Sequence, residues 1–224
     1  MEQLKYKLIR SSRRTLALEI DKNAQLIVRS PQLLSIKKVK DFINEKQNWI
    51  LKKQQQILEK KANRPKKQYI NGEKFLYLGN EYPLNIVEKQ YEPLFLLQDT
   101  FYLAKKYQKN ASEIFKIWYK KTAEKLIPPR VKLYANKHNL TFNNIRITDA
   151  TTRWGSCSTY NNLNFNLALI MADIDVIDYV IAHEVAHTIH KNHSSDFWQL
   201  VEVIKPNYKK HKEWLKNNAE LLII

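Results

Sequence analysis

Three residues near the C-terminal end of the chain have the types and spacing of a metal-dependent catalytic site. His183 and His187 stand four residues apart, and Glu184 follows the first of them directly. Residues four apart on a helix lie on one face about one turn from each other, so both imidazoles can reach the same metal ion. The glutamate lies where a general base is needed. The segment therefore predicts metal-assisted hydrolysis on a helix, with further ligands still to be found.

The third ligand must come from beyond this helix. His193 follows six residues after the second motif histidine, and at about 100° per residue a continuing helix would place it on the far face. The chain must therefore turn before His193. Asn192 suits a left-handed residue that ends a helix, and Ser194 and Ser195 offer an N-cap for a next helix over 196–204.

Other residues compete for the third position. His190 lies on the same helical face as His183, but seven residues correspond to about 10.5 Å along the axis. Two nitrogens that bind one zinc ion lie within roughly 3.5 Å of each other, which favours His193 over His190. A carboxylate from Glu202 or Glu213 also suits zinc chemically and stays open as an alternative.

The expected cofactor is Zn²⁺, held by two or more imidazoles with one position open for water. Glu184 would accept a proton from that water and later pass it to the leaving group. Negative charge that develops on the substrate needs a further hydrogen-bond donor. Arg153, Tyr208 and His211 are the candidates for this substrate or transition-state role.

Composition restricts the class of protein. Cys157 is the single cysteine of the 224 residues, which excludes an intrachain disulfide and a cysteine-rich zinc ribbon. The start of the chain, residues 1–7, lacks the apolar run of a signal peptide, and no stretch of 18 apolar residues occurs. We therefore expect a cytoplasmic protein without a membrane partner. Its oligomeric state cannot be read from the sequence.

Positive charge is concentrated in the first half of the chain. The net charge is +16; residues 1–110 contain 23 Lys or Arg and 11 Asp or Glu, whereas residues 111–224 contain 15 and 11. An excess of this kind favours polyanions through counterion release. Nucleic acid or nucleotides are therefore conceivable partners of the basic N-terminal region, beside solvated lysine-rich surfaces without a partner.

Short extended runs bounded by turn residues predict strands in the first half, at 6–10, 15–20, 25–29, 75–78, 82–87, 94–97 and 100–103. The turn at 21–23 predicts a hairpin. Ser35 can cap one long helix over about 35–60, whose apolar residues recur at helical spacing. The later strands are expected to join the first ones in one sheet or small barrel.

The second half predicts a helix from about Asn110 or Ser112 that is interrupted at Pro128-Pro129 and then resumes to His138. Strands follow at 145–147 and 163–169, and then the motif helix, which begins near Asp175 and is capped by the Asp173/Asp175 pair. The expected fold class is α+β. A basic β-rich region over 1–108 would precede a catalytic domain over 109–224.

Several segments resemble the YgjP-like family of zinc-dependent hydrolases, which is distantly related to the SprT and WLM metallopeptidases. They are 153–157 (Arg-Trp-Gly-Ser-Cys), the strand from Leu163, the motif segment 179–187, and 192–198 (Asn-His-Ser-Ser-Asp-Phe-Trp), together with 10–14 and Trp49-Ile50. The resemblance covers nearly the whole chain and is most specific over 151–198.

This resemblance implies a zincin-like catalytic domain in which His183, His187 and His193 bind zinc and Glu184 is the base. It also implies that a strand beside the motif helix could receive an extended substrate. A metzincin is excluded because His190 occupies the position of the glycine in that motif and no methionine follows it.

The expected function is a zinc metallopeptidase that cleaves protein or peptide substrates. Two alternatives stay open: a metal-dependent nucleoside triphosphate pyrophosphohydrolase, an activity also attached to the family, and a nucleic-acid-associated protease targeted by its basic N-terminal region. Only three glycines occur in the chain, so no Gly-rich phosphate loop supports the pyrophosphohydrolase alternative.

Overall fold

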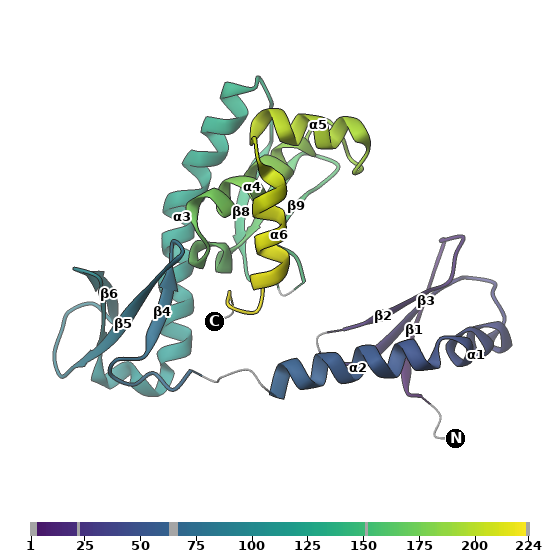
Figure 1. Cartoon of the computed structure of the whole chain (residues 1–224), viewed down its shortest axis with the longest axis horizontal. Coiled ribbons are helices and arrows are strands. Elements are labelled where there is room, and N and C mark those ends of the chain that lie inside the picture. The colour runs from purple at the N-terminus through teal and green to yellow at the C-terminus, as the bar shows by residue number, and fades with distance from the viewer. Residues whose placement is uncertain (1–3, 22, 63–66, 151, 223–224) are drawn as a thin grey trace. The chain divides into compact units, whose positions relative to one another are not determined.

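The computed structural model describes residues 4–21, 23–62, 67–150 and 152–222 (Figure 1). The chain forms two compact units, one ending at residue 66 and the other beginning at residue 67. Among the described residues, no helix combines the length and the apolar content needed to cross a membrane.

A three-stranded sheet begins the first unit, with strands β1 (Tyr6–Ser11), β2 (Ala17–Ile20) and β3 (Leu26–Pro31). The spatial order is β1-β3-β2; β1 pairs with β3 in parallel and β2 pairs with β3 antiparallel. Asp21 stabilises the turn between β2 and β3, because its carboxylate accepts hydrogen bonds from the backbone N–H groups of Asn23 and Gln25 at 2.8 Å each. The predicted hairpin is confirmed.

Two helices, α1 (Ile36–Glu45) and α2 (Gln47–Ala62), replace the single long helix that was expected. Ser35 caps α1 as predicted, accepting a hydrogen bond from the backbone of Lys38. Lys46 separates the helices with φ −96° and ψ 11°. The break escaped the sequence pattern because Ile43 and Ile50, one on each side of it, are both buried at helical spacing in the same core.

A four-stranded sheet begins the second unit, with β4 (Lys74–Tyr77), β5 (Asn80–Val87), β6 (Leu94–Leu97) and β7 (Thr100–Ala104) in the order β4-β5-β7-β6. It is a separate sheet, so the expected continuation of the first strands into one sheet or barrel is wrong. The β6–β7 turn consists of Gln98 and Asp99, both with positive φ, a conformation that suits the twist of a tight hairpin.

The short 3₁₀ helix η1 (Lys105–Asn110) leads into α3 (Ala111–Lys137), which runs through both prolines without interruption. Each proline removes one helical hydrogen bond, at a cost of about 3 kcal/mol or more in a helix interior. The predicted interruption is nevertheless wrong, because the buried face of α3 continues across the prolines. Every fourth residue is buried, namely Ala111, Phe115, Tyr119, Ala123, Ile127, Val131 and Ala135.

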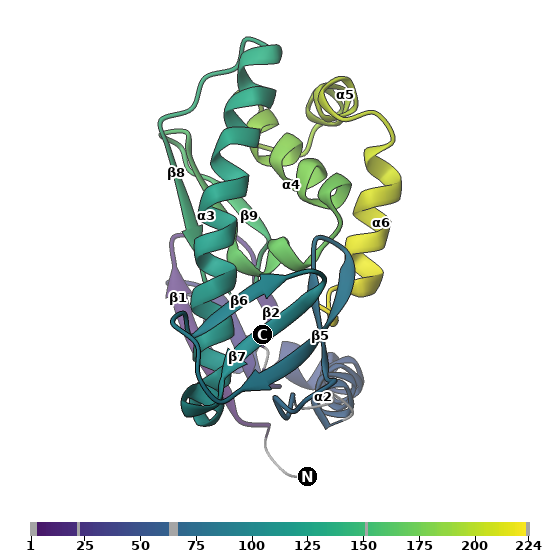
Figure 2. The ribbon, with the colours of Figure 1, turned by 90° about the vertical axis from the view of Figure 1, so that its left-hand side faces the viewer.

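Aromatic side chains join the β4–β7 sheet to α3. Phe75 stacks on Phe115 with ring centroids 4.1 Å apart, and Phe101 meets Trp118 edge to face at 4.9 Å. Figure 2 shows this sheet across the N-terminal half of α3 and the motif helix beside its C-terminal half. The compact units therefore divide the chain before residue 67 and not near 108/109. The reason is that residues of the β4–β7 sheet and residues after 108 form one hydrophobic core.

A second small sheet contains β8 (Asn144–Thr148), β9 (Gly155–Cys157) and β10 (Asn162–Asn166) in the order β8-β10-β9. Strand β10 is parallel to β8 and antiparallel to β9. The strand predicted over 163–169 ends early, and the 3₁₀ helix η2 (Leu167–Met171) follows. Asn166 causes the change, because its side chain accepts a hydrogen bond from the backbone N–H of Ala168 at 2.9 Å.

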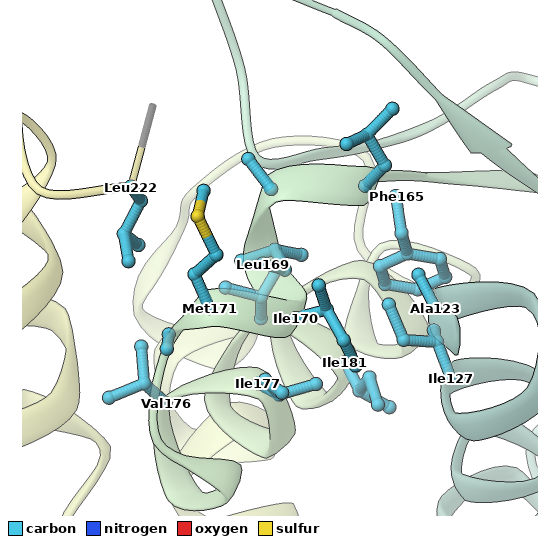
Figure 3. Packing of buried hydrophobic residues seen from close by; sticks show 14 of the residues in the cluster. Ala123, Ile127, Phe165, Leu169, Ile170, Met171, Val176, Ile177, Ile181 and Leu222 are labelled. Atoms are coloured by element: carbon cyan, nitrogen blue, oxygen red, sulfur yellow. The ribbon is translucent and has the colours of Figure 1, made fainter. Parts of the chain in front are cut away.

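The motif helix α4 (Ile174–Ala186) begins at the predicted Asp173 cap, whose carboxylate accepts a hydrogen bond from the backbone of Asp175. Two more helices follow, α5 (Ser195–Ile204) and α6 (Tyr208–Asn218). Figure 3 shows side chains of η2, α4 and α3 in one cluster, including Ile170, Ile177 and Ile127. These apolar contacts fix one side of α4.

A buried ion pair fixes α4 against α3 as well. The Arg130 guanidinium donates two hydrogen bonds of 2.6 Å to the Asp178 carboxylate, and the Tyr134 hydroxyl donates a third at 2.9 Å. Asp178 is buried, and a bidentate pair of this kind holds both its partners in one orientation. Because Asp178 lies in the N-terminal half of α4, these hydrogen bonds fix that half of the helix against α3.

Candidate metal centre

Three imidazole nitrogens converge at the C-terminal end of α4, where His183 belongs to the last turn of the helix and His187 is its C-cap. The Nε2 atom of His193 lies 3.1 Å from Nε2 of His183 and 3.2 Å from Nε2 of His187. Two nitrogens bound at about 2.1 Å to one tetrahedral ion would be roughly 3.4 Å apart. The ligand atoms of all three residues lie within 4.8 Å of one another, so the three side chains can share one metal ion.

A tight turn brings His193 back to the helix. His187 ends α4, and the backbone N–H groups of Ile189 and His190 both donate to the carbonyl of Ala186. Asn192 does not adopt the positive φ that was expected of it, so that detail of the prediction is wrong. The chain reverses through these hydrogen-bonded turns, which directly follow the helix, and no left-handed residue is needed there.

His190 contributes its backbone and not its ring. The Nδ1–H group of His187 donates a hydrogen bond of 2.8 Å to the carbonyl oxygen of His190. This bond fixes the tautomer of His187 and leaves its Nε2 lone pair free for a metal. The rings that form the ligand cluster are those of His183, His187 and His193.

Lys191 links the turn between His187 and His193 to the end of strand β9. Its ammonium group lies 3.1 Å from the carbonyl oxygen of Ser158 and 3.6 Å from the sulfur of Cys157, and it also donates to the side chain of Asn161. Burial raises the pKa of the Cys157 thiol. The contacts of Lys191 therefore help to hold His193 in place.

Two aromatic side chains of helix α5 pack against the three imidazoles. Phe197, which is fully buried, stacks on His187 at 4.3 Å and presents its ring to His183 and His193 at 4.9 Å each. Trp198 stacks on His193 at 5.6 Å. Sequence reasoning gave these two residues no role, although both follow Ser194, the predicted cap of their helix.

Glu184 is buried beside the histidines, with 5% of its surface exposed. One carboxylate oxygen, Oε2, is buried and has no hydrogen-bond partner among the described residues. Burial raises the pKa of Glu184 to about 8, although the charge of Arg153 opposes the shift. Desolvation lowers the pKa of His183 to about 3, and it also lowers the pKa of His187. Both imidazoles are therefore neutral, as metal ligands must be.

Gly155 makes room for this carboxylate. A Cβ atom at Gly155 would lie 2.5 Å from Oε1 of Glu184 and 2.6 Å from its Cγ. Strand β9 can therefore pass the base closely only with glycine at this position. The sequence contained Gly155 as part of the Arg-Trp-Gly-Ser-Cys segment, but no local pattern could reveal a contact across 29 residues.

We expect Gly155→Ala to lower kcat/KM for hydrolysis by about 10²-fold, because a displacement of the base by about 1 Å is enough for a loss of that size. The new methyl group must push the carboxylate of Glu184 away from its position. Steady-state kinetics beside thermal unfolding will separate activity from folding. An unchanged kcat/KM would contradict the close approach.

The burial of Glu184 also predicts a pH-dependent stability difference. Between its unfolded value of 4.5 and its folded value of about 8, the folded metal-free protein binds more protons than the unfolded chain. The contribution of Glu184 to stability is thus present at low pH and is lost as the pH rises through this window. A glutamine at this position does not titrate, so it causes no such loss of stability as the pH rises.

Chemical unfolding of metal-free protein at pH 5 and pH 8 measures the effect. Glu184→Gln should become more stable relative to wild type at the higher pH, by up to roughly 4 kcal/mol. The exposed Glu202→Gln serves as the control and should show no comparable trend. Equal pH profiles for wild type and Glu184→Gln would show that the carboxylate is not desolvated.

A cavity of about 190 Å³ opens beside this centre. Its walls include His183, Glu184, Gly155 and Trp154, together with Tyr179 from the preceding turn of α4. Burial raises the pKa of Tyr179 to about 12, so its hydroxyl keeps its proton at neutral pH. Sequence reasoning missed Tyr179, although its position four residues before His183 places it on the same helical face.

The three predicted donors lie elsewhere. Tyr208 is buried in a stack between Trp198 at 5.3 Å and Tyr179 at 6.3 Å, and it does not line this cavity. His211 interacts with Asp175 in the first turn of α4, at the other end of that helix. Arg153 lines a neighbouring cavity of about 360 Å³.

The two glutamates that were alternatives for the third ligand lie away from the imidazole cluster. Glu202 and Glu213 are exposed, and neither belongs to the ligand cluster among the described residues. The geometry therefore favours His193 over a carboxylate.

The chain was also compared with solved structures, curated proteins and protein-family models. The solved metallopeptidase zymogen of Pyrococcus abyssi abylysin is similar with a TM-score of 0.39 and 19% identity, over 42% of this chain and 94% of that chain. No curated protein matched the chain. The family model of the YgjP-like metallopeptidase domain matches residues 14–218. The chain, whose fold is α+β, therefore belongs to the YgjP-like family of metallopeptidases.

Proposed function

We propose that the protein is a zinc-dependent peptidase that cleaves peptide bonds with Glu184 as its general base. One observation supports this most strongly: the Nε2 atom of His193 lies 3.1 and 3.2 Å from those of His183 and His187, next to a buried carboxylate that lines a cavity. His183, His187 and His193 are the proposed ligands. A set of nitrogen donors of this kind suits zinc.

Zinc in such a site lowers the pKa of water and polarises a carbonyl oxygen. The chain supplies the remaining steps. Oε2 of Glu184, which has no partner among the described residues, is free to accept a proton from the attacking water. The same carboxyl group can return this proton to the leaving amine, and its desolvation makes it a stronger base than an exposed glutamate.

Tyr179 is proposed as the donor that stabilises the developing negative charge. Its hydroxyl is protonated at neutral pH, and Tyr179 lines the cavity together with Glu184 and His183. Its position supports this role better than the positions of Tyr208 and His211 do. A fixed donor in a partly dry cavity strengthens its hydrogen bond as charge appears on the substrate.

Tyr179→Phe should lower kcat by about 10²-fold and change KM little, since loss of one such donor acts mainly on the transition state. Steady-state kinetics with a peptide substrate measures both constants. Tyr208→Phe is the matched comparison, because it removes a hydroxyl from the same stack outside the cavity. A larger loss in Tyr208→Phe would return the donor role to Tyr208.

Strand β9 offers the substrate a place to bind. It is the last strand of its sheet, paired with β10 on one side. It also carries Gly155, which touches the base. An extended peptide could add to the free edge of β9 through main-chain hydrogen bonds and bring its scissile bond to the cavity.

The proposal is tested with wild-type protein and Glu184→Gln, each with and without metal. Both are incubated with unfolded protein, with unfolded protein plus DNA, and with nucleoside triphosphates. Peptide cleavage that requires Glu184 supports the peptidase. Pyrophosphate release that requires Glu184 would replace it with the phosphohydrolase. DNA binding with a steep salt dependence and unchanged cleavage would make the basic N-terminal region an anchor.

A further inference from the structure

A second cavity, of about 360 Å³, lies beside the catalytic one and shares Trp154 and Gly155 with it. Its other walls come from the end of β8, from Arg153, and from residues of β9 and β10 such as Ser156 and Asn164. Its volume is within the range of small-molecule sites and far above that of one water. A substrate bound near Glu184 can therefore place a neighbouring group in it.

The charge of this cavity is positive. Asp149 lines it, but the Lys116 ammonium lies 2.6 Å from the Asp149 carboxylate and neutralises it. Arg153 is the other charged residue of the wall, and none of the ion pairs formed by the described residues includes it. Its backbone is fixed, because its carbonyl oxygen accepts a hydrogen bond from Asn166. Arg153 is exposed, and its guanidinium donates no hydrogen bond to the described residues, so its donors are available to a ligand in the cavity.

A neutral donor complements Arg153. The side-chain amide of Asn164 donates to the hydroxyl oxygen of Ser156 at 3.2 Å, so the hydroxyl proton of Ser156 is free to donate in turn. A guanidinium and a hydroxyl in one cavity suit a carboxylate, which accepts up to four hydrogen bonds. A cationic side chain would instead face Arg153 without a counter-charge.

We infer that this cavity is a specificity subsite for a carboxylate of the peptide substrate, a residue or two from the bond that is cut. The carboxylate is either an acidic side chain or the α-carboxylate of the substrate C-terminus. The inference rests on the proposed peptidase function, because it takes the neighbouring cavity as the place of bond cleavage. Arg153 then binds substrate and does not stabilise the oxyanion.

The test uses peptides in which each position flanking the cut bond is Glu or its neutral isostere Gln, with a free or an amidated C-terminus. Binding is measured to the Glu184→Gln protein, which would keep the peptides intact, and cleavage is measured with wild type. We expect about tenfold tighter binding of the carboxylate peptide, as for one charge-assisted hydrogen-bonded contact at an exposed site. The series that shows the preference identifies the source of the carboxylate.

Arg153→Gln in the Glu184→Gln background should bring the ratio of the two affinities close to one, and Arg153→Lys should retain part of it. Arg146→Gln is the matched control, because Arg146 is an exposed arginine of the same sheet outside the cavity, and it should keep the ratio. An unchanged ratio in Arg153→Gln would overturn the inference.

The outcomes also separate the subsite from the proposed function. Cleavage by wild type without any carboxylate preference would remove the subsite and leave the peptidase. An Arg153-dependent preference without cleavage would remove the peptidase and leave a carboxylate-binding site. Neither cleavage nor preference would overturn both.

Discussion

Glu184→Gln is expected to lower kcat/KM for peptide cleavage by about 10³-fold or more, while the metal content stays at that of wild type. Gln keeps the shape of the buried side chain but cannot accept and return the proton, and general base catalysis contributes about 10²- to 10⁴-fold. We expect a loss toward the upper end of this range because Oε2 of Glu184 is buried without a hydrogen-bond partner among the described residues, in a residue that lines the same cavity as His183.

Steady-state kinetics with an unfolded protein substrate, together with elemental analysis, measures both quantities. Glu202→Gln is the matched control, since Glu202 is exposed on α5 away from the cluster. Activity within a few-fold of wild type in Glu184→Gln would remove Glu184 from the chemistry. Loss of metal from this variant would show that the carboxylate holds the site together instead.

His193→Ala is expected to weaken zinc binding by at least about 10³-fold and to abolish cleavage. Loss of an outer-shell partner alone costs about 10- to 100-fold in metal affinity, and a ligand contributes more. The ring of His193 completes the convergence of three nitrogens, and Trp198 stacked on it limits its movement.

His190→Ala is the control for this experiment, because the carbonyl oxygen that accepts from His187 is part of the backbone and persists in the variant. Zinc affinity is measured by competition with a chromophoric chelator. Zinc retained at one ion per chain with wild-type affinity in His193→Ala would contradict the ligand assignment. Loss in His190→Ala as well would indicate that the turn itself had collapsed.

Local sequence signals predicted the elements of the site well. The spacing of His183 and His187, the Asp173 cap and the Ser194 cap each act within one or two helical turns, and the structure contains all three. The same holds for the β2–β3 hairpin, whose turn is stabilised by the side chain of Asp21. Such features depend on neighbours in the sequence and are visible there.

Contacts between distant segments escaped prediction. α3 continues through Pro128 and Pro129 because of its burial against α4, and the pattern of one helix cannot report its partner. Gly155 meets Glu184, and Tyr179 shares a cavity with Trp154, only after the sheet and α4 have packed together. The boundary between the compact units moved for the same reason, through the aromatic contacts of Phe115.

Metal-dependent cleavage of an unfolded protein is the decisive test of the proposed zinc peptidase. Purified protein is stripped of metal with a chelator, divided, and supplied with increasing zinc, and the products are identified by mass spectrometry. We expect no cleavage in the stripped sample and full recovery near one zinc per chain, with new termini at peptide bonds. Cleavage that persists at the same rate in the stripped protein would contradict this expectation.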